Sequence, residues 1–318
     1  MRGGQTMTMK LSEKFHPSRL MRRFAPHGLL PLPVTAFGPP PETLGRIGSL
    51  EVRLARTPKE IRLAQGLRFD VFYKEMSAQP NAAGLLRRRD VDDFDAICDH
   101  LLVVDHDADQ QALPGRRRRK GPVVVGTYRL LRQEVAERAR GFYTAGEFEI
   151  EDLIDRHRPK RFLELGRSCV LKSYRTKRTV ELLWSGIWAY CQHYEIDVML
   201  GCASFEGCDP EKLKLPLSFL HHNAPAPEEW KVRAVPHRYV AMNRLPAEAI
   251  DLKAALASLP PLVKGYLRLG AYIGDGAVVD RQFGTTDVII VLPVSSIRPR
   301  YLGYFGTPRT TRTTGVAH

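Results

Sequence analysis

Charged side chains occur within otherwise apolar segments at four places along this sequence of 318 residues. They are Arg68 in LRFDVF, Asp92 and Asp95 in DVDDFD, Arg129 in VVGTYRLL, and Glu164 and Arg167 in LELGRS. A charge is costly to bury unless it is paired, so one interpretation is a structural network of ion pairs. The other is a catalytic site, because a carboxylate can take a proton from an attacking amine and an arginine can bind a substrate carboxylate.

The segment FLELGRSCV is expected to lie in a strand at Arg161–Leu171. Side chains alternate between the two faces of a regular strand, which would place Glu164 and Arg167 on opposite faces. A β-bulge near Gly166 would change that relation.

A basic loop joins this strand to an amphipathic helix predicted at Thr179–Tyr194. A loop that leads into a helix N-terminus is a common phosphate-binding arrangement. The candidate phosphate ligands are Arg175, Lys177, Arg178 and Thr179. Phosphate loops are usually rich in glycine, yet there is none between Arg167 and Leu183. Any phosphate bound here would be held by cationic side chains and the helix N-terminus.

The surrounding elements follow from hydrophobic periodicity and from turn residues. Thr57 caps the first helix, and Pro58 occupies its first position. Strands are predicted at 50–56, 100–105, 123–132, 161–171, 197–205 and 230–235, and helices at 58–73, 133–141, 179–194, 210–221 and 249–269. Glycines at 270–280 are interpreted as shaping a loop or bulge before a strongly apolar strand. The order predicts a mixed α/β fold with one central sheet flanked by helices.

Composition divides the chain into four parts. Residues 1–48 are basic and rich in Pro and Gly, which predicts a flexible leader. A core at 49–245 is followed by an extension at 246–306 that packs on it, and by a disordered tail at 307–318. Within the core, the polybasic tip GRRRRK lies between two predicted strands. It is interpreted either as a solvated insertion or as a docking site for an acidic partner.

The bulk composition limits the class of protein. The net charge of +13 favours acidic partners, namely nucleic acid, anionic lipid headgroups or an acidic protein. Five cysteines without a C-x-x-C pair indicate neither a disulfide framework nor a zinc site, and they fit a reducing compartment. No apolar stretch is long enough to span a bilayer, and no signal peptide is expected. We therefore expect a cytoplasmic protein, either free or docked peripherally on the inner face of the membrane.

The strand, basic loop and helix of Phe162–Trp184 resemble the acyl-donor site of the GNAT acyltransferase superfamily. The resemblance implies that a splayed strand exposes backbone N–H groups to a thioester, here those of Ser168, Cys169, Val170 and Leu171. GNAT loops usually read [RQ]-x-x-G-x-[GA], and Arg175–Val180 lacks both glycines. This departure disfavours the pyrophosphate of coenzyme A. It favours the single phosphodiester of the phosphopantetheine arm of acyl carrier protein, an acidic partner that suits the positive charge.

The embedded charges also resemble the signature of the acyl-homoserine-lactone synthases, which are GNAT-fold enzymes that use acyl carrier protein. The matching positions are Arg68 and Phe72, Asp92 and Asp95, Arg129, and Glu164 and Arg167. The present chain is much longer than those synthases, and its C-terminal third has no counterpart in them.

That third resembles the L-ornithine N-acyltransferases of ornithine-lipid biosynthesis, sometimes labelled hemolysin-like. The matching segments include LGCASFEGCDP (200–210), LSFLHHN (217–223) and HRYVAMNR (237–244). The resemblance covers about residues 50–306. It implies transfer of a 3-hydroxyacyl group from acyl carrier protein to the α-amine of L-ornithine, which gives lyso-ornithine lipid. No permanently bound cofactor is implied.

Roles follow from the chemistry of amine acylation. Glu164 is the expected base, and Asp92 or Asp95 is either the base or the ligand of the acceptor's side-chain ammonium. Substrate binding is assigned to Arg68, Phe72, Arg129 and Arg167. Backbone N–H groups near Ser168–Leu171 are the candidate oxyanion donors. The reaction needs no metal and no covalent enzyme intermediate, so Cys169 is not proposed as a nucleophile.

Other interpretations stay open at this point. They are an autoinducer synthase, a coenzyme-A-dependent acetyltransferase, a non-catalytic basic protein that binds membrane or nucleic acid, and a membrane-damaging toxin. His221 and His222 are interpreted as favourable residues at a helix end rather than metal ligands. Trp184 and Trp188 lie on one helix face and are interpreted as core residues.

Overall fold

The computed structural model describes residues 37–298, apart from 77, 81 and 109–121. The chain divides into two units, Met1–Gly38 and Pro39–His318, and the elements below belong to the second. The predicted polybasic tip, residues 1–36 of the predicted leader and the predicted tail at 307–318 lie outside the described residues. Part of the remaining leader, Gly45–Ile47, is a strand of the sheet.

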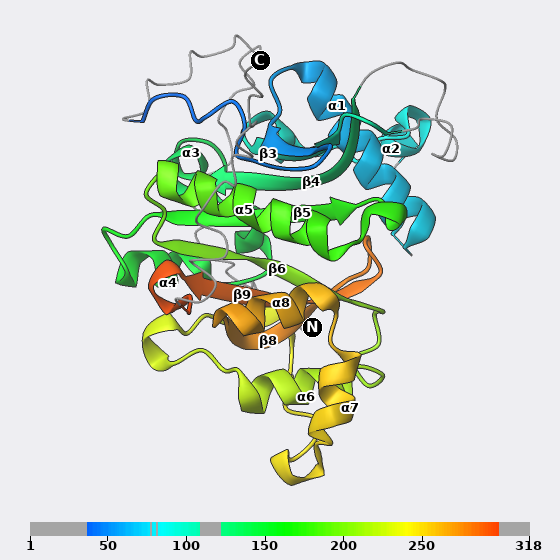
Figure 1. Cartoon of the computed structure of the whole chain (residues 1–318). Helices are drawn as coiled ribbons and strands as arrows, with labels where there is room; N and C mark the ends of the chain where they lie inside the picture. The colour runs from blue at the N-terminus through cyan, green and yellow to red at the C-terminus, as the bar shows by residue number, and fades with distance from the viewer. Residues whose placement is uncertain (1–36, 77, 81, 109–121, 299–318) are drawn as a thin grey trace, which may run out of the picture. The chain divides into compact units, whose positions relative to one another are not determined.

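One sheet organises the described part of the chain (Figure 1). Its nine described strands are β1 Gly45–Ile47, β2 Leu50–Leu54, β3 Asp99–Asp105, β4 Val123–Arg132, β5 Phe162–Val170, β6 Val198–Glu206, β7 Tyr239–Val240, β8 Tyr272–Asp280 and β9 Thr285–Pro293. Their spatial order is β1-β2-β3-β4-β5-β6-β9-β8-β7. Among these strands, β5 and β6 form a parallel pair and the other neighbours are antiparallel.

Helices flank this sheet on both faces. The described α-helices are α1 Pro58–Phe69, α2 Ala82–Arg87, α3 Gln133–Arg138, α4 Ile150–Arg156, α5 Lys177–His193, α6 Lys214–Asn223, α7 Leu252–Ser258 and α8 Pro261–Leu269. A π-helical turn at Asp70–Glu75 continues α1. The predicted mixed α/β fold with a central sheet flanked by helices is therefore confirmed.

Capping residues set the starts of the two helices nearest the site. Thr57 accepts a hydrogen bond from the Glu60 N–H at the start of α1, as the sequence predicts. Thr176 does the same for α5 by accepting from the Thr179 N–H. Helix α5 therefore begins at Lys177, two residues before the predicted start.

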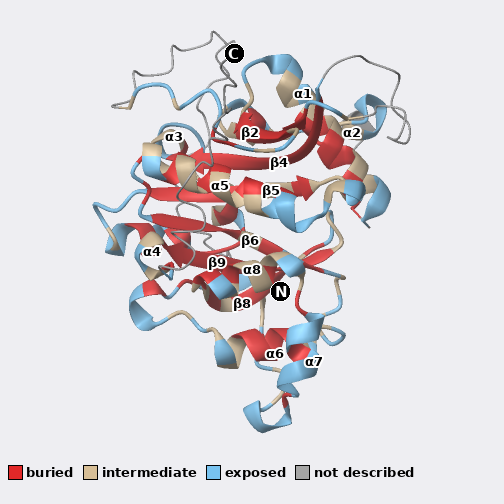
Figure 2. Cartoon of the chain, viewed as in Figure 1, coloured by how far each residue is buried: buried red, intermediate tan, exposed pale blue. Residues whose placement is uncertain are grey.

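The contacts of strand β3 show which helix lies on which face of the sheet. Leu102 and Val104 pack with Ala64 and Leu67 of α1, whereas Leu101 lies close to Gly186 of α5. Neighbouring residues of a strand point to opposite faces, so α1 and α5 cover opposite faces of the sheet. In Figure 1, α5 and α8 lie in front of the sheet, and Figure 2 shows the strands behind them as mostly buried.

The structure corrects three details of the prediction. The predicted strand at 230–235 is instead a short 3-10 helix, Glu228–Trp230, followed by isolated bridges. The predicted helix at 249–269 is two helices, because Pro260 and Pro261 interrupt it. The glycine-rich segment at 270–280 is mostly strand β8, with a register shift between Ile273 and Ala277.

The predicted extension at 246–306 contributes strands to the central sheet. β9 pairs with β6 from end to end, and β8 pairs with β9. Side chains of these two strands can therefore reach the same region as side chains of β5 and β6. Within the described residues, the helices are too short or too polar to cross a membrane.

Candidate active site

Strands β5 and β6 separate part-way along their length. Their parallel pairing ends at Glu164 and Leu200, whereas β5 stays paired with β4 as far as Val170. Gly201 lies at the point of separation, where a Cβ atom would come within 2.2 Å of the Leu165 carbonyl oxygen. The gap exposes one edge of the β5 backbone, as the sequence analysis expects of a splayed strand.

A β-bulge lies in β5 within this gap. Thr127 and Arg129 of β4 are two residues apart, but their partners Cys169 and Gly166 are three apart. Arg167 absorbs the extra residue in the left-handed region, with φ of 51°. The bulge brings Glu164 and Arg167 to the wall of one cavity, which a regular strand would not do.

This cavity has a volume of about 210 Å³ and draws its walls from distant segments. Phe72 comes from the π-helical turn, and Tyr143 and Thr144 come from a short 3-10 helix, Tyr143–Gly146. Strand β5 contributes Glu164–Ser168. Strands β6, β8 and β9 with the β8–β9 turn contribute Cys202, Ser204, Asp280, Phe283, Thr285 and Asp287.

Glu164 lies in the cavity wall but is almost entirely buried, with 5% of its surface exposed. One carboxylate oxygen accepts the Thr144 N–H at 2.6 Å and the other accepts the Tyr143 N–H at 3.1 Å. Burial raises the pKa of Glu164, and these hydrogen bonds offset the rise only in part. A carboxylate with a raised pKa, held rigidly beside a cavity, suits a proton acceptor.

Arg167 is stacked between two aromatic rings of the cavity. Its guanidinium carbon lies 4.8 Å from the ring centre of Tyr143 and 4.7 Å from that of Phe283. It also forms ion pairs with Asp90 at 3.3 Å and Asp92 at 3.0 Å. These contacts hold a cationic group in a fixed position on the cavity wall.

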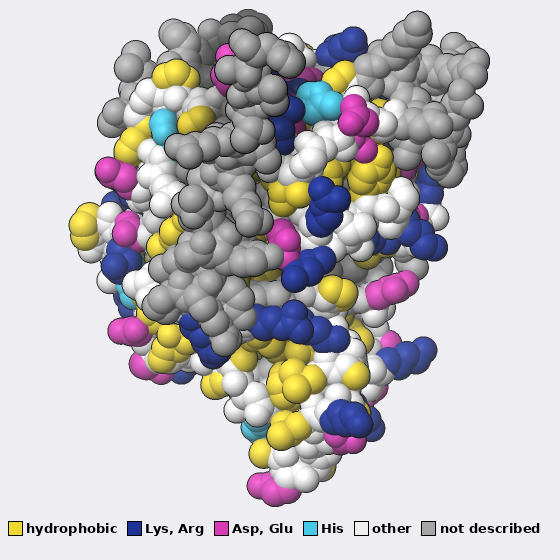
Figure 3. All heavy atoms as spheres, viewed as in Figure 1, with side chains coloured by type: hydrophobic (Ala, Val, Ile, Leu, Met, Phe, Trp, Pro, Cys, Tyr) yellow, Lys and Arg dark blue, Asp and Glu magenta, His cyan; other side chains and the backbone are white. Residues whose placement is uncertain are grey.

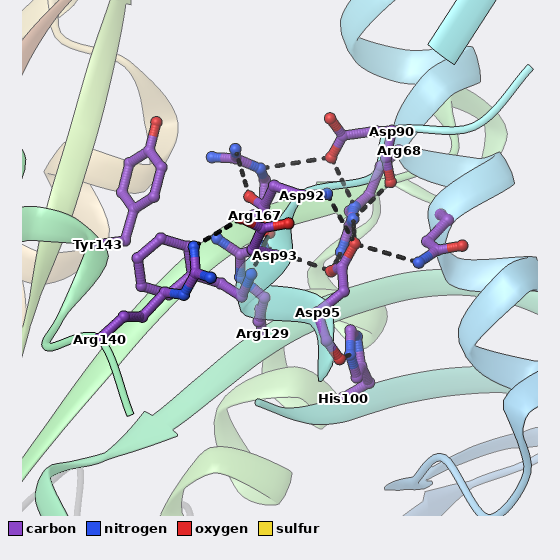
Figure 4. Close-up of polar contacts among 12 residues, drawn as sticks. Arg68, Asp90, Asp92, Asp93, Asp95, His100, Arg129, Arg140, Tyr143 and Arg167 are labelled. Atoms are coloured by element: carbon purple, nitrogen blue, oxygen red, sulfur yellow. Dashed lines mark hydrogen bonds and ion pairs between the residues drawn. The ribbon is translucent and has the colours of Figure 1, made fainter. Parts of the chain in front are cut away.

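Behind this wall lies a buried network of three arginines and three aspartates (Figure 4). Arg68 forms a bidentate pair with Asp95, with both distances at 2.8 Å. Its Nε atom lies 2.8 Å from Asp90. Arg129 Nη1 lies 2.5 Å from Asp92 and 3.4 Å from Asp95. The charges of Arg68, Arg129 and Arg167 thus balance those of the three aspartates.

Comparisons with known proteins identify the family of this chain. Residues 67–185 match the family model described as an acetyltransferase (GNAT) domain. An L-ornithine N(alpha)-acyltransferase of Rhizobium meliloti (strain 1021) is 57% identical over 272 residues, covering 84% of this chain and 88% of the relative. The chain belongs to the L-ornithine N(alpha)-acyltransferase family.

Further relatives carry the same name. The L-ornithine N(alpha)-acyltransferase of Brucella abortus (strain 2308) is 57% identical and covers 83% of this chain and 91% of its own. That of Rhodobacter capsulatus is 37% identical, with coverage of 81% and 95%. The protein is therefore an acyltransferase, and the alternative of a non-catalytic basic protein is wrong.

Solved structures with a similar fold include FeeM, an N-acyl amino acid synthase from uncultured soil microbes. It is 10% identical, with a TM-score of 0.44 and coverage of 77% of this chain and 91% of its own. BjaI, a CoA-dependent acyl-homoserine lactone synthase, is 14% identical, with a TM-score of 0.41 and coverage of 79% and 84%.

The predicted site residues of this acyltransferase fall into two groups, those that line the cavity and those buried behind its wall. Phe72, Arg129, Glu164 and Arg167 line the cavity. Arg68 is fully buried, and Asp95 is bound to it behind the wall. Burial would raise the pKa of Asp95, but Arg68 outweighs burial and lowers it to about 2. Asp95 thus supports the site from behind, and its low pKa makes it a poor base.

Asp92 bridges the two arginines of the cavity wall. One of its oxygens pairs with Arg129 and the other with Arg167. It also caps the 3-10 helix Asp93–Ala96 by accepting from the Phe94 N–H. The ion-pair network of the first interpretation is therefore present, and it positions two arginines that line the cavity. The catalytic role of these residues stays a prediction.

The predicted oxyanion donors of β5 differ in their availability. The Leu171 N–H donates to the Val125 carbonyl on β4 at 2.9 Å. Backbone groups of successive strand residues point in opposite directions, so the N–H of Val170 points into the gap. By the same alternation the Cys169 N–H points towards β4, and Ser168 lines the cavity. Val170 and Ser168 thus remain candidates, and Leu171 is committed to the sheet.

The predicted phosphate ligands lie around the N-terminus of α5. Arg175 donates to the Val170 carbonyl at 3.0 Å and pairs with Glu75 at 2.6 Å. Lys177 and Arg178 are exposed in the first turn of α5, and Thr179 is buried. Arg175 therefore lies at the end of the β5 gap. Lys177 pairs with Glu181 at 3.4 Å, and the Arg178 guanidinium lies close to Gly48.

Sequence reasoning missed an acidic group beside the cavity, and two of its members, Asp280 and Asp287, line the cavity. Glu147, Asp280 and Asp287 each bring one carboxylate oxygen within 4.8 Å of the others. Two of them belong to β8 and β9, which the sequence analysis assigns to the extension. Asp287 stands in the apolar segment TTDVIIVLP, so the signal that singled out Arg129 and Glu164 was present here too.

Proposed function

We propose that this acyltransferase moves a 3-hydroxyacyl group from acyl carrier protein to the α-amine of L-ornithine. The product would be lyso-ornithine lipid, in the first step of ornithine-lipid biosynthesis. The observation that best supports this proposal is the cavity at the β5–β6 gap. Its wall presents a buried carboxylate, Glu164, and a fixed guanidinium, Arg167. Relatives named for acylation of the α-nitrogen of L-ornithine, at 57% identity, supply the choice of acceptor.

The reaction uses groups that the cavity wall provides. The amine nitrogen attacks the thioester carbon, and its proton passes to Glu164 directly or through water. The negative oxygen of the tetrahedral intermediate accepts from the Val170 N–H in the gap. The carbon–sulfur bond then breaks, and the pantetheine thiolate takes up the proton from Glu164, directly or through water. Arg129 and Arg167 attract the carboxylate of the acceptor.

The donor arm would enter along the exposed edge of β5. A phosphodiester at the N-terminus of α5 would meet the helix dipole and the side chains of Lys177 and Arg178. Figure 3 shows Lys and Arg side chains spread over the face that carries α5 and α8. Such a face suits an acidic carrier protein and supports the proposal of a carrier-bound donor.

The test of the proposed function is a comparison of donors with labelled ornithine as acceptor. We expect a labelled lyso-lipid from 3-hydroxyacyl-acyl carrier protein and much less from the matching acyl-coenzyme A. Equal use of both donors would refute the carrier-protein assignment while leaving the acceptor intact. Absence of acylated ornithine with either donor would refute the proposed function.

A charge-reversal variant tests the entry of the carrier protein. Lys177→Glu with Arg178→Glu is expected to lower kcat/KM for the carrier-bound donor by at least about tenfold, with little change for an acyl-pantetheine donor. Arg138→Glu is the control, because Arg138 is an exposed residue of α3, outside the donor loop. Equal loss with both donors would show that the variant damages the fold or the chemistry instead.

The fatty product leads us to propose peripheral association with the inner face of the membrane. Each basic residue near an anionic surface contributes about 1 kcal/mol, and the chain carries a net charge of +13. Flotation with anionic vesicles should recover the protein at low salt and lose it at high salt. Recovery in the soluble fraction at low salt would contradict this assignment.

A further inference from the structure

Asp287 is a buried carboxylate that the reaction above leaves without a role. It lies on β9 with 6% of its surface exposed, and it lines the cavity. Within the described residues, its Oδ1 atom is buried without a hydrogen-bond partner. An unpaired charge in such a place is costly, so its presence at the cavity wall points to a ligand that completes it.

The surroundings of Asp287 are strongly acidic. The carboxylates of Glu147 and Asp280 lie within 4.8 Å of it, and Arg238 approaches Glu147 at 3.5 Å. Within the described residues, the Arg238 guanidinium is thus the cation that pairs with this group of three carboxylates. Burial and the neighbouring carboxylates raise the pKa of both Asp287 and Glu147. A cationic ligand would relieve this repulsion.

The other two carboxylates already have structural partners. Asp280 accepts the backbone N–H groups of Gln282 and Phe283 in the β8–β9 turn. Glu147 pairs with Arg238, and the Cys202 thiol lies 3.2 Å from its carboxylate. Asp287 also interacts with Ser204 and Thr285. Within the described residues, however, it is the member of the group with a fully buried oxygen that lacks a hydrogen-bond partner, and it lines the cavity.

Two members of the acidic group, Asp280 and Asp287, line the same cavity as Arg129 and Arg167. Phe283 connects the acidic and the cationic residues, because its ring stacks on Arg167 at 4.7 Å while its backbone N–H donates to Asp280 at 3.0 Å. An occupant with a carboxylate at one end and a second ammonium group at the other would satisfy both walls. Asp92 and Asp95, the predicted ligands of that ammonium, are instead paired with arginines.

We infer that Asp287, backed by Glu147 and Asp280, holds the side-chain ammonium of the acceptor and makes the cavity selective for a diamino acid. This inference rests on the proposed function. It assigns a specificity role to β9, outside the residues that carry the acyl transfer.

The test compares L-ornithine with L-norvaline, which has the same carbon chain without the side-chain amine. With any donor that the protein accepts, the wild type should prefer ornithine by on the order of 10²-fold or more in kcat/KM. Asp287→Asn should lower kcat/KM for ornithine by on the order of 10²-fold and leave that for norvaline unchanged or higher. Asp155→Asn, which removes an exposed carboxylate on α4, should change neither value.

The outcomes separate this inference from the proposed function. A wild type that acylates norvaline as well as ornithine would overturn it without any variant. A folded Asp287→Asn protein that keeps the ornithine preference, or loses both acceptors equally, would also overturn it. Loss of wild-type activity in EDTA would assign the acidic group to a metal ion instead. Absence of ornithine acylation by the wild type would refute the proposed function itself.

Discussion

Replacing Arg68 by methionine should destabilise this acyltransferase by about 3–5 kcal/mol. The Arg68 side chain is fully buried and supplies both hydrogen bonds of the bidentate pair with Asp95. It also pairs with Asp90 at 2.8 Å. Methionine fills a similar volume but leaves two buried carboxylates short of a cation.

The shifted pKa of Asp95 gives a second measure of the same interaction. Burial opposes ionisation of Asp95, yet the hydrogen bonds and charge of Arg68 lower its pKa from the ordinary 3.8 to about 2. A shift of nearly two pH units corresponds to roughly 2–3 kcal/mol. Arg129 remains near Asp95 at 3.4 Å and compensates for part of the loss. Both measures predict a fall in Tm of roughly 10 °C.

The assay is thermal unfolding at neutral pH with two companion variants. Arg62→Met, on the exposed side of α1, should change the free energy of unfolding by less than about 0.5 kcal/mol. Arg68→Met with Asp95→Leu should regain most of the lost stability, because it removes the unpaired carboxylate as well. An Arg68→Met protein within about 1 kcal/mol of the wild type would refute the account of the network.

Three further predictions concern the cavity and its supports. Glu164→Gln keeps the shape of the side chain but cannot accept a proton, so kcat should fall about 10²–10⁴-fold, and a loss below about tenfold would place the base elsewhere. The amide keeps one acceptor oxygen for the two backbone N–H groups, so the free energy of unfolding should also fall by about 1–3 kcal/mol. Gly201→Ala should lower the free energy of unfolding by about 1–3 kcal/mol in denaturant titration, because its Cβ would lie 2.2 Å from the Leu165 carbonyl oxygen; unchanged unfolding would contradict the close approach. Burial raises the pKa of Glu147 to about 7 from 4.5, so the folded state holds that proton longer than the unfolded state, and stability should fall as pH rises across this range. Glu147→Gln should flatten that fall, and an equally steep fall in the variant would assign it to other groups. The groups that face Glu147 are Cys202, Arg238, Asp280 and Asp287.

Local patterns in the sequence predict much of the fold correctly. The run at 123–132 forms β4 with the predicted bounds, because a continuous apolar segment with β-branched residues suits a central strand. The sequence pattern does not predict strand β8, because glycines interrupt its apolar residues. The structure shows why they are there: a Cβ atom on Gly274 would lie 2.7 Å from the Val232 carbonyl oxygen. A close contact between segments so far apart leaves no local trace in the sequence.

The sequence predicts residues of the candidate site, but not which of them line the cavity and which support it from behind. Embedded charge marked both Glu164 and Arg68, yet the structure places Glu164 on the cavity wall and Arg68 behind it. The sequence indicates, from Gly166, that a bulge would change which side chains share a face of β5. The structure has that bulge, at Arg167. The role of Asp287 depends on the pairing of β9 with β6, which hydrophobic periodicity does not reveal.

The most direct test of the account is the position of the new amide bond. L-ornithine labelled with ¹⁵N at either the α- or the side-chain nitrogen would be acylated, and the lipid product examined by NMR for the nitrogen bonded to the acyl carbon. With the side-chain ammonium held at Asp287 and the α-amine beside Glu164, only the α-nitrogen should carry the acyl group. Acylation of the side-chain nitrogen would contradict the proposed placement of the acceptor in the cavity.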